Sequence, residues 1–539
     1  MYAILLSALL SSAAWPAVRQ DTVPLYDNLG THQYRISTQV PAAQSYFDQG
    51  LRLYYGFNHA EAIRSFREAQ RRDSTCAMCF WGEALAWGPN INAPMDSASG
   101  AAAWAAITGA SARLARASES EAALVAALRQ RYAEVPPPER SALDSAYAHA
   151  MMSVTRRFPG DQDIAVLSAE AAMDLRPWNY WTPAGTLQPG MAEALAQLEQ
   201  VIANNASHPG ACHFYIHAVE AMHPERAVAC AERLAALMPG AGHLVHMPGH
   251  IYIRVGRYLD AIQANEHAVH ADQSYIRDQR PDLGTYTAGY YPHNYDFLAF
   301  AAAMAGRRSQ ALAAADSLAV VIPHALLGAP GMGFLQHHLT RALQMRVRFA
   351  EWDAILEAPA PADSLVHARG IWHYARGRAF TATGRLDQAD RELRALGALA
   401  ADPRVIGLRL EFNESPVVLK LAEHVLRGVI ASARGAHADA ETALRQAAEQ
   451  EAALTYGEPP EWSIPVRQSL GHARLSAGDA RGAERAFRDD LARFPANGWS
   501  LAGLIAALEA DGRGHEAGEF RQQLAIAQRD SDVSFSAER

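Results

Sequence analysis

The sequence predicts an all-α fold built from repeated helical hairpins. Strand-like alternation is nearly absent, whereas alanine- and leucine-rich segments with a helical spacing of apolar residues dominate the chain. Gly, Pro and Asp interrupt these segments at short intervals, as turns between helices do. The segments recur with a period of about 34 residues, which is typical of a two-helix repeat. A chain of 539 residues suits such an array better than one compact core.

The first clear repeat covers residues 46–70, YFDQGLRLYYGFNHAEAIRSFREAQ. Gly50 takes the small position of a first helix, and Ala62, Phe66 and Ala69 follow at the spacing of a second. Small residues let the two helices of a hairpin approach closely. The aromatic residue is expected to wedge into the next hairpin.

The most complete repeat covers residues 469–495, SLGHARLSAGDARGAERAFRDDLARFP. Gly471, Ala483, Phe487 and Pro495 occupy the same positions there. Shorter copies of the pattern occur at residues 256–268, 305–315, 383–393, 434–447 and 510–520.

This pattern resembles the tetratricopeptide repeat (TPR) over nearly all of the folded length. The resemblance implies an α-solenoid of TPR-like helical hairpins, curled into a superhelix with a concave groove lined by the first helix of each repeat. The chain also resembles a group of exported bacterial TPR proteins of poorly known function, which carry YFDQGLRLYYGFNHAEAIRSFREA and GHLVHMPGHIYIRVGRY in similar form. That second resemblance implies no particular activity.

The region 101–200 fits the repeat worst, although its sequence is helical. Within it, EVPPPERS (134–141) is expected to form a turn, and MDLRPWNYWTP (173–183) an aromatic loop. Trp178 and Trp181 in that loop either line an entrance or fill a core. The Asn-rich loop WGPNIN at 87–92 either closes over the groove or caps a helix.

The pattern divides the chain into six parts. These are a signal peptide at 1–17, an extended segment at 18–40, N-terminal TPR-like hairpins at 41–200, central His-rich repeats at 201–330, C-terminal TPR repeats at 331–531 and a tail at 532–539.

Residues 1–17 are apolar for about a dozen positions, which is too short for a membrane span and typical of a signal-peptide core. The segment lacks the usual positive charge, and a buried N-terminal helix is the alternative. We expect an exported protein, periplasmic or extracellular.

No later segment has the length and hydropathy of a membrane span. The formal charge of −9 gives no indication of nucleic-acid binding.

The chain has four cysteines, Cys76, Cys79, Cys212 and Cys230. CAMC (76–79) is a single CxxC, whereas a structural zinc site usually needs a second pair. In an exported protein a disulfide is permitted either within CAMC or between Cys212 and Cys230. Small buried residues in helices are the equally favoured alternative.

Three histidines, His243, His246 and His250, follow one another at helical steps of three and four residues. On one helix they fall within an arc of about 60°. The TPR resemblance implies that this face lines the groove. Pro248 weakens the argument, because a helix that begins near Met247 would leave the first two histidines on the preceding turn.

The two neighbouring repeats carry similar residues. HFYIHAVE (213–220) supplies His213, His217 and Glu220, and YYPHNYDF (290–297) supplies His293 and Asp296. First helices of neighbouring repeats lie about 10 Å apart, so imidazoles from three repeats can reach one ion.

Such a set suits one or two transition-metal ions, because neutral imidazole binds copper, zinc and iron and carboxylates complete or orient the shell. The expected ligands are the six histidines 213, 217, 243, 246, 250 and 293. Glu220 or Asp296 would act as a ligand, an orienting group or a base. Polar packing against tyrosines and a metal-free ligand groove are the alternatives.

Two functions fit these sequence features. One is a metal-dependent oxidoreductase or hydrolase acting on a small substrate. The other is a non-catalytic TPR scaffold that binds a peptide or protein partner in its concave groove. The concentration of histidines in the central repeats favours the first. The later histidines in QHHL (336–339) and IWHY (371–374) are expected to pack in the core, with His337 as a candidate for the groove rim.

Overall fold

The computed structural model describes residues 23–95 and 97–535, and no β-strand occurs within them. The all-α prediction is therefore confirmed. All of the predicted signal peptide (1–17), the first residues of the extended segment (18–22) and the end of the tail (536–539) lie outside the described residues. None of the described helices combines the length and hydropathy needed to cross a bilayer.

The chain forms two compact units. The first comprises residues up to Ile251 together with Ala264–Tyr291, and the second comprises Tyr252–Gln263 together with Pro292 onward. The predicted His-rich region 201–330 therefore contributes to both units.

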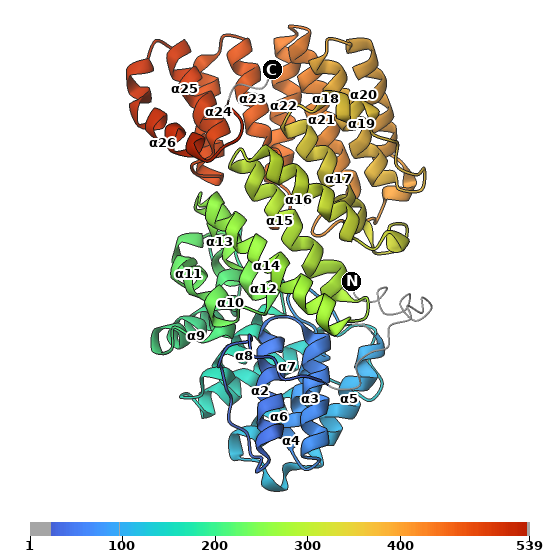
Figure 1. Cartoon of the computed structure of the whole chain (residues 1–539), viewed down its shortest axis with the longest axis vertical. Helices are drawn as coiled ribbons and strands as arrows, with labels where there is room; N and C mark the ends of the chain where they lie inside the picture. The colour runs from blue at the N-terminus through green and yellow to red at the C-terminus, as the bar shows by residue number, and fades with distance from the viewer. Residues whose placement is uncertain (1–22, 96, 536–539) are drawn as a thin grey trace. The chain divides into compact units, whose positions relative to one another are not determined.

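Consecutive helices of the first unit pack side by side as hairpins, as Figure 1 shows. The helices from α2 to α14 are α2 (Pro41–Tyr55), α3 (His59–Arg72), α4 (Ala77–Ala86), α5 (Ser97–Ser111), α6 (Glu119–Arg129), α7 (Ser141–Arg157), α8 (Gln162–Met173), α9 (Met191–Asn204), α10 (Pro209–Val219), α11 (Val228–Leu237), α12 (Gly242–His246), α13 (Pro248–Arg254) and α14 (Tyr258–Gln279), the last two of which are shared between the units.

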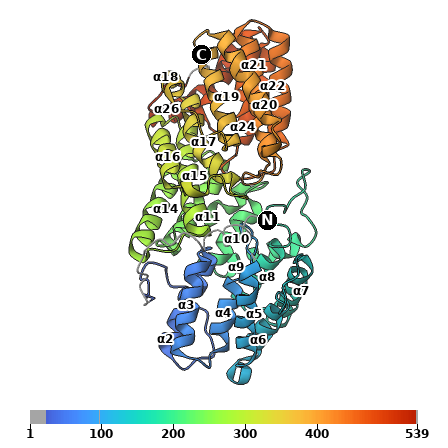
Figure 2. The same cartoon turned by 90° about the vertical axis from the view of Figure 1, so that its right-hand side faces the viewer.

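The second unit continues the same arrangement, and α19 to α22 lie side by side in Figure 2. Its helices are α15 (Tyr291–Met304), α16 (Arg308–Val321), α17 (Gly333–Arg348), α18 (Trp352–Glu357), α19 (Val366–Ala382), α20 (Leu386–Ala400), α21 (Ser415–Ala433), α22 (His437–Ala452), α23 (Val466–Ser476), α24 (Ala480–Arg493), α25 (Gly498–Ala510) and α26 (Gly518–Arg529).

An aromatic residue wedged between glycines holds successive hairpins together. Phe66 of α3 is fully buried, and a methyl group on Gly50 of α2 or on Gly82 of α4 would overlap its ring. Phe487 of α24 lies in the same way between Gly471 and Gly503. The TPR-like packing predicted for residues 46–70 and 469–495 is thus confirmed in both units.

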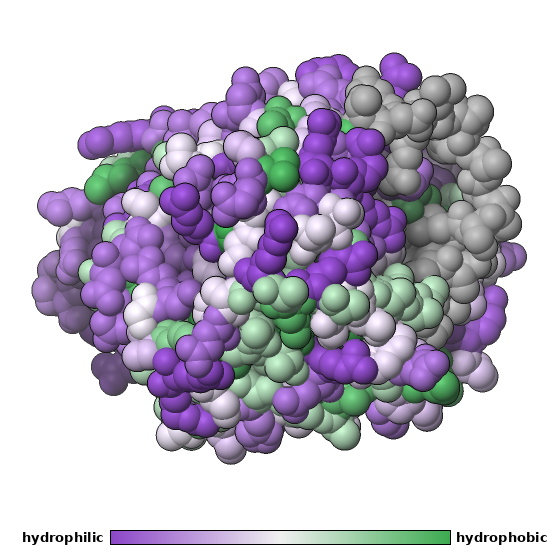
Figure 3. Space-filling view, turned by 90° about the horizontal axis from the view of Figure 1, so that it is seen from below, coloured by the Kyte–Doolittle hydropathy of each residue, from purple (hydrophilic) through white to green (hydrophobic). Residues whose placement is uncertain are grey.

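The outer surface is mixed in character. Figure 3 shows one face, on which small groups of hydrophobic residues lie among hydrophilic ones. This is the surface expected when the apolar stripe of each helix packs inward and its other side meets water.

The close contact of Gly82 with Phe66 leads to a direct prediction. Gly82→Ala places a methyl group inside the Phe66 ring, and overpacking of this kind typically costs about 1–3 kcal/mol. We expect a lower midpoint in urea denaturation. Gly160→Ala is the matched control, because nothing lies within 4 Å of the added carbon there. Equal midpoints for the two variants would contradict the wedge.

Candidate metal centre

Three short elements of the first unit carry the central histidines. His213 and His217 lie on α10, His243 and His246 on α12, and His250 on α13. Glu220 is the C-terminal cap of α10.

Residues 243–250 form two helices that meet at Met247, so the break that Pro248 made possible is present, although His243 and His246 lie on a short helix of their own and not on a turn. Pro248 has no N–H to continue the hydrogen-bond ladder, and it starts α13 at its first position. Met247 keeps a helical conformation (φ −51°, ψ −34°), so the chain continues in nearly the same direction. His243, His246 and His250 therefore still converge despite the break.

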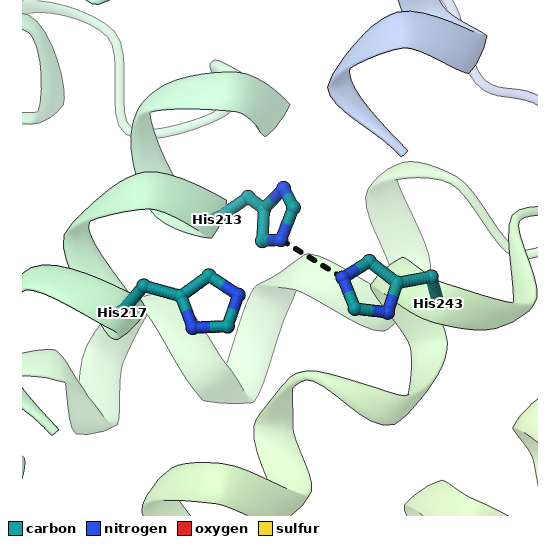
Figure 4. A group of neighbouring side chains, drawn as sticks. All are labelled: His213, His217 and His243. Atoms are coloured by element: carbon teal, nitrogen blue, oxygen red, sulfur yellow. Dashed lines mark hydrogen bonds between the residues drawn. The ribbon is translucent and has the colours of Figure 1, made fainter. Parts of the chain in front are cut away.

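The first histidine set is drawn in Figure 4, where the rings of His213 and His217 from α10 face the ring of His243 from α12. One nitrogen of each ring lies within 4.8 Å of the others. The Nε2 atoms of His213 and His243 are 3.2 Å apart.

The second histidine set, His246 and His250, lies beside the first. The Nε2 atoms of His246 and His250 are 2.9 Å apart. The ring centres of His217 and His250 are 5.3 Å apart, and those of His243 and His246 are 5.8 Å apart. Five imidazoles thus form one continuous group.

All five rings are buried rather than exposed in an open groove. The residues are between 0% and 2% accessible to solvent. The expectation of groove-lining histidines, which came from the TPR resemblance, is corrected here. Aromatic side chains enclose the cluster. Phe57 stacks on His243, Tyr290 lies 4.6 Å from the same ring, and Trp178 lies 5.1 Å from His217, each measured between ring centres.

A single carboxylate orients two of the rings. Glu220 Oε1 lies 3.0 Å from His217 Nδ1, and its Oε2 lies 2.6 Å from His250 Nδ1. An ionised carboxylate only accepts hydrogen bonds, so both Nδ1 atoms carry the proton and donate it. In the neutral form of each ring the lone pair is therefore on Nε2.

Two further rings are fixed in the same tautomer. His213 Nδ1 lies 2.7 Å from the carbonyl oxygen of Tyr55, and His246 Nδ1 lies 2.7 Å from the side-chain oxygen of Asn265. Both oxygens are acceptors, so these Nδ1 atoms are donors as well. Metal-binding histidines are usually held by such a hydrogen bond on the nitrogen that does not bind the metal.

The electrostatics favour the neutral form of two of the rings. Burial, reinforced by neighbouring histidines, lowers the pKa values of His213 and His243 well below the ordinary range. Burial by itself would raise the pKa of Glu220, but attraction and hydrogen bonds from His250 and His217 lower it to about 2. His217 Nε2 and His243 Nδ1 are buried and have no hydrogen-bond partner among the residues that the structure describes.

Two predicted loops meet beside the cluster. The Trp178 indole N–H donates to Asn92 Oδ1 at 3.0 Å, which joins the aromatic loop 173–183 to the Asn-rich loop 87–92. Trp178 also has a positive φ of 65°, which is uncommon for a bulky residue. This conformation accompanies its stacking on His250. The two loops thus cover one side of the histidines.

His293 and Asp296 belong to the second unit. His293 Nδ1 lies 3.7 Å from Glu411 Oε1. Asp296 pairs with the buried guanidinium of Arg341, with 2.8 Å between Oδ2 and Nη2. The charge of Asp296 is therefore balanced within its own unit.

The other histidines singled out in the sequence are also in the second unit. His337 is only 2% exposed, so it is a buried residue and not a rim residue. Its Nδ1 lies 3.2 Å from His367 Nε2, and His367 Nδ1 lies 3.0 Å from Ser415 Oγ.

The four cysteines differ in their disulfide bonding. Cys76 and Cys79 form a disulfide at the N-terminus of α4. Cys212 and Cys230 are buried free thiols. Of the pairings left open by the sequence, the structure contains the one within CAMC.

Another histidine group in the first unit is held in the opposite tautomer. His32 Nε2 lies 2.9 Å from Asp163 Oδ1, which also accepts from the Tyr55 hydroxyl at 2.7 Å and lies 3.4 Å from His208 Nε2. His208 Nδ1 accepts the N–H of Ala211 as the cap of α10, so its proton is on Nε2. That nitrogen, 3.4 Å from Asp163 Oδ1, therefore carries a proton and is not a metal ligand in this arrangement.

Several residues of the cluster were not predicted. The carbonyl of Tyr55 and the ring of Phe57 come from the repeat at 46–70, about 150 residues away. Asn265 carried no usable sequence signal either, because the full burial that obliges its amide to find a partner is known only from the structure.

Comparisons with known proteins add little beyond the fold. No protein-family model matches the chain, and no curated protein matches it. Among solved structures, human IFIT1 as a dimer with m7Gppp-AAAA is 12% identical and covers 92% of this chain and 91% of its own, with a TM-score of 0.31. The P58(IPK) TPR domain is 14% identical and covers 69% of this chain and 98% of its own, with a TM-score of 0.17. At these scores neither likeness supports an inference about function.

The role of Glu220 is testable without metal. Glu220→Gln keeps one acceptor oxygen and turns an N–H₂ group toward a histidine N–H, and a buried donor left unsatisfied costs about 1–3 kcal/mol. We expect the chelator-treated variant to unfold at lower urea concentration at pH 7. Glu225→Gln is the control, since that side chain is 65% exposed and should change stability by less than about 0.5 kcal/mol. Identical curves for both variants would refute this role.

Proposed function

We propose that this protein is an exported, TPR-like repeat protein that binds a transition metal in its first unit and uses it in a metal-dependent reaction on a small substrate, as an oxidoreductase or hydrolase. One observation carries the proposal. Four of the five clustered rings donate from Nδ1 to fixed acceptors, so Nε2 is the nitrogen that each of them would offer to a metal.

An all-imidazole set favours copper, zinc or iron over calcium or magnesium, which prefer oxygen ligands. Glu220 has both oxygens engaged with ring N–H groups. We therefore assign it the role of orienting group rather than direct ligand or base.

Burial argues against the alternative of a peptide-binding groove at this position. A peptide partner recognised by these histidines would need them at the surface, yet none of the five is more than 2% exposed. Their enclosure by Phe57, Trp178 and Tyr290 suits a small ligand better, because closed sites exclude water and strengthen polar interactions.

Metal binding should stabilise the folded chain. Zinc at about 100 times its dissociation constant is expected to raise the unfolding free energy by about 2.7 kcal/mol, because only the folded state offers the assembled site. Thermal unfolding of chelator-treated protein, with and without zinc or copper, measures this shift.

The matched variant for this test is His217→Ala combined with His250→Ala, which removes one ring on either side of Glu220. It should lose most of the shift. His515→Ala is the control, because that side chain is 80% exposed and lies in the second unit. A parent protein with neither bound transition metal nor a zinc- or copper-dependent shift would rule out the metal centre.

Export is supported by the Cys76–Cys79 disulfide, since disulfides persist mainly in oxidising compartments. It also agrees with the apolar segment 1–17 and with the resemblance to exported bacterial TPR proteins.

Residues 1–17 should direct export of a reporter. Fused to an alkaline phosphatase that is active only where its disulfides form, they should give activity in a bacterial host. The same fusion without the segment is the control and should be inactive. Equal activity of the two fusions would contradict the assignment.

A further inference from the structure

We propose that an open cavity of the first unit, lined by three tyrosines and separate from the histidine cluster, binds a small organic cation, a primary ammonium compound. The cavity measures about 370 Å³, which is within the size range of sites for small ligands. Its walls come from residues 24–29, the end of α2, residues 239–241 and the stretch from Ala271 to Tyr286, all of which belong to the first unit.

The aromatic part of the wall consists of Tyr26, Tyr275 and Tyr286. The ring centres of Tyr275 and Tyr286 are 5.7 Å apart. The face of an aromatic ring carries partial negative charge and attracts a cation, and this attraction is strongest where water is partly excluded. Three such rings around one cavity therefore favour a positively charged ligand.

The hydroxyl protons of these tyrosines are already used. Tyr26 and Tyr275 donate to the carboxylate of Glu61, at 3.0 and 3.4 Å, and Tyr286 donates to Asp272 at 2.6 Å. Burial, together with these carboxylates, raises the pKa values of all three hydroxyls, so the rings stay neutral. A hydroxyl that donates its one proton to a carboxylate has none left for an anionic ligand.

Backbone donors in the wall are also engaged. The N–H groups of Gly56 and Asn58 donate to carbonyl oxygens within the turn that ends α2. The N–H groups of Gly240 and Ala241 donate to the carbonyl oxygens of Asn28 and Met238. An anion would find few donors along these stretches of the wall, whereas an ammonium group brings its own donors.

The charge around the cavity is negative. Among the described residues that line it there is no lysine, arginine or histidine, and the charged ones are Asp27 and Asp278. The two buried carboxylates behind the tyrosines add to this charge. Two arginines offset part of it, since Arg64 pairs with Glu61 at 2.7 Å and the exposed Arg277 pairs with Asp278 at 2.9 Å. Four carboxylates against two guanidinium groups leave an excess of negative charge.

The cavity shares a wall with the histidine cluster. Tyr286, which lines the cavity, lies 5.7 Å from Tyr290, and Tyr290 lies 4.6 Å from His243, each measured between ring centres. Gly56 lines the cavity, and the next residue, Phe57, stacks on His243. The ammonium site and the histidines are therefore neighbours that use different residues, so one can be tested without the other.

The test is calorimetric titration of the chelator-treated, full-length protein with benzylamine, which is protonated at pH 7. Removal of metal ensures that the amine cannot bind as a metal ligand. We expect saturable binding of one benzylamine per chain. Benzyl alcohol and benzoate, of similar size but neutral and anionic, should bind at least about tenfold more weakly, because they lose the cation–π attraction and the charged hydrogen bonds. Absence of benzylamine binding, or equal binding of either analogue, would overturn the proposal.

Two variants locate the site. Asp278→Lys places a competing ammonium group at a position that is 55% exposed, and it should weaken benzylamine binding about tenfold or more. Glu266→Lys is the matched control, because it makes the same charge change at an exposed position about 18 Å away along α14, outside the lining, and it should bind as the parent does.

Ser274→Phe fills the cavity and should abolish binding, whereas Gln273→Phe at the exposed neighbouring position should not. Far-UV circular dichroism checks folding, and Asp278→Lys decides if Ser274→Phe does not fold. Parent-like affinity in either folded cavity variant would place the amine elsewhere and overturn the site. None of these residues is a proposed metal ligand, so failure here leaves the metal centre to its own test.

Discussion

The hydrogen bonds that Glu220 accepts from His217 and His250 are the constraint on which the centre depends. A buried carboxylate is costly unless its charge is matched, and here two ring N–H groups satisfy it. The same bonds decide which nitrogen of each ring is left with a lone pair. The carboxylate thus stabilises the fold locally and sets the chemistry of the site. The Tyr55 carbonyl and the Asn265 side chain likewise decide which nitrogen of His213 and of His246 carries the proton.

The repeat architecture explains how residues far apart in the sequence reach one point. Glycines opposite aromatic wedges let the hairpins stack closely, as around Phe66. This stacking brings the end of α2, which supplies Tyr55 and Phe57, against α10. The break at Pro248 then turns what would be one long helix into two short ones, and both still present histidines to the same cluster. The covering loops around Trp178 complete the enclosure.

The sequence was sufficient to predict the fold and the histidines at the core of the cluster. Steps of three and four residues between histidines identified the facing rings, and the repeat period identified the hairpins. The acceptors could not be predicted, because a backbone carbonyl such as that of Tyr55 has no sequence signature and Asn265 depends on tertiary contacts. The burial of the rings was not predicted either, because the family resemblance placed the histidines on a concave groove. The residue type alone would suggest His208 as a metal ligand. Its role as the N-terminal cap of α10 instead places its proton on Nε2.

The most direct test of the converging lone pairs is an anomalous difference map from crystals of zinc- or copper-loaded protein, recorded at the absorption edge of the metal. The account predicts strong peaks about 2.0–2.1 Å from the Nε2 atoms of clustered rings, with the Nδ1 atoms of His213, His217, His246 and His250 still bonded to their acceptors. A well-ordered cluster without such a peak, or a metal bound through the Nδ1 atoms of His217 or His250, would contradict it.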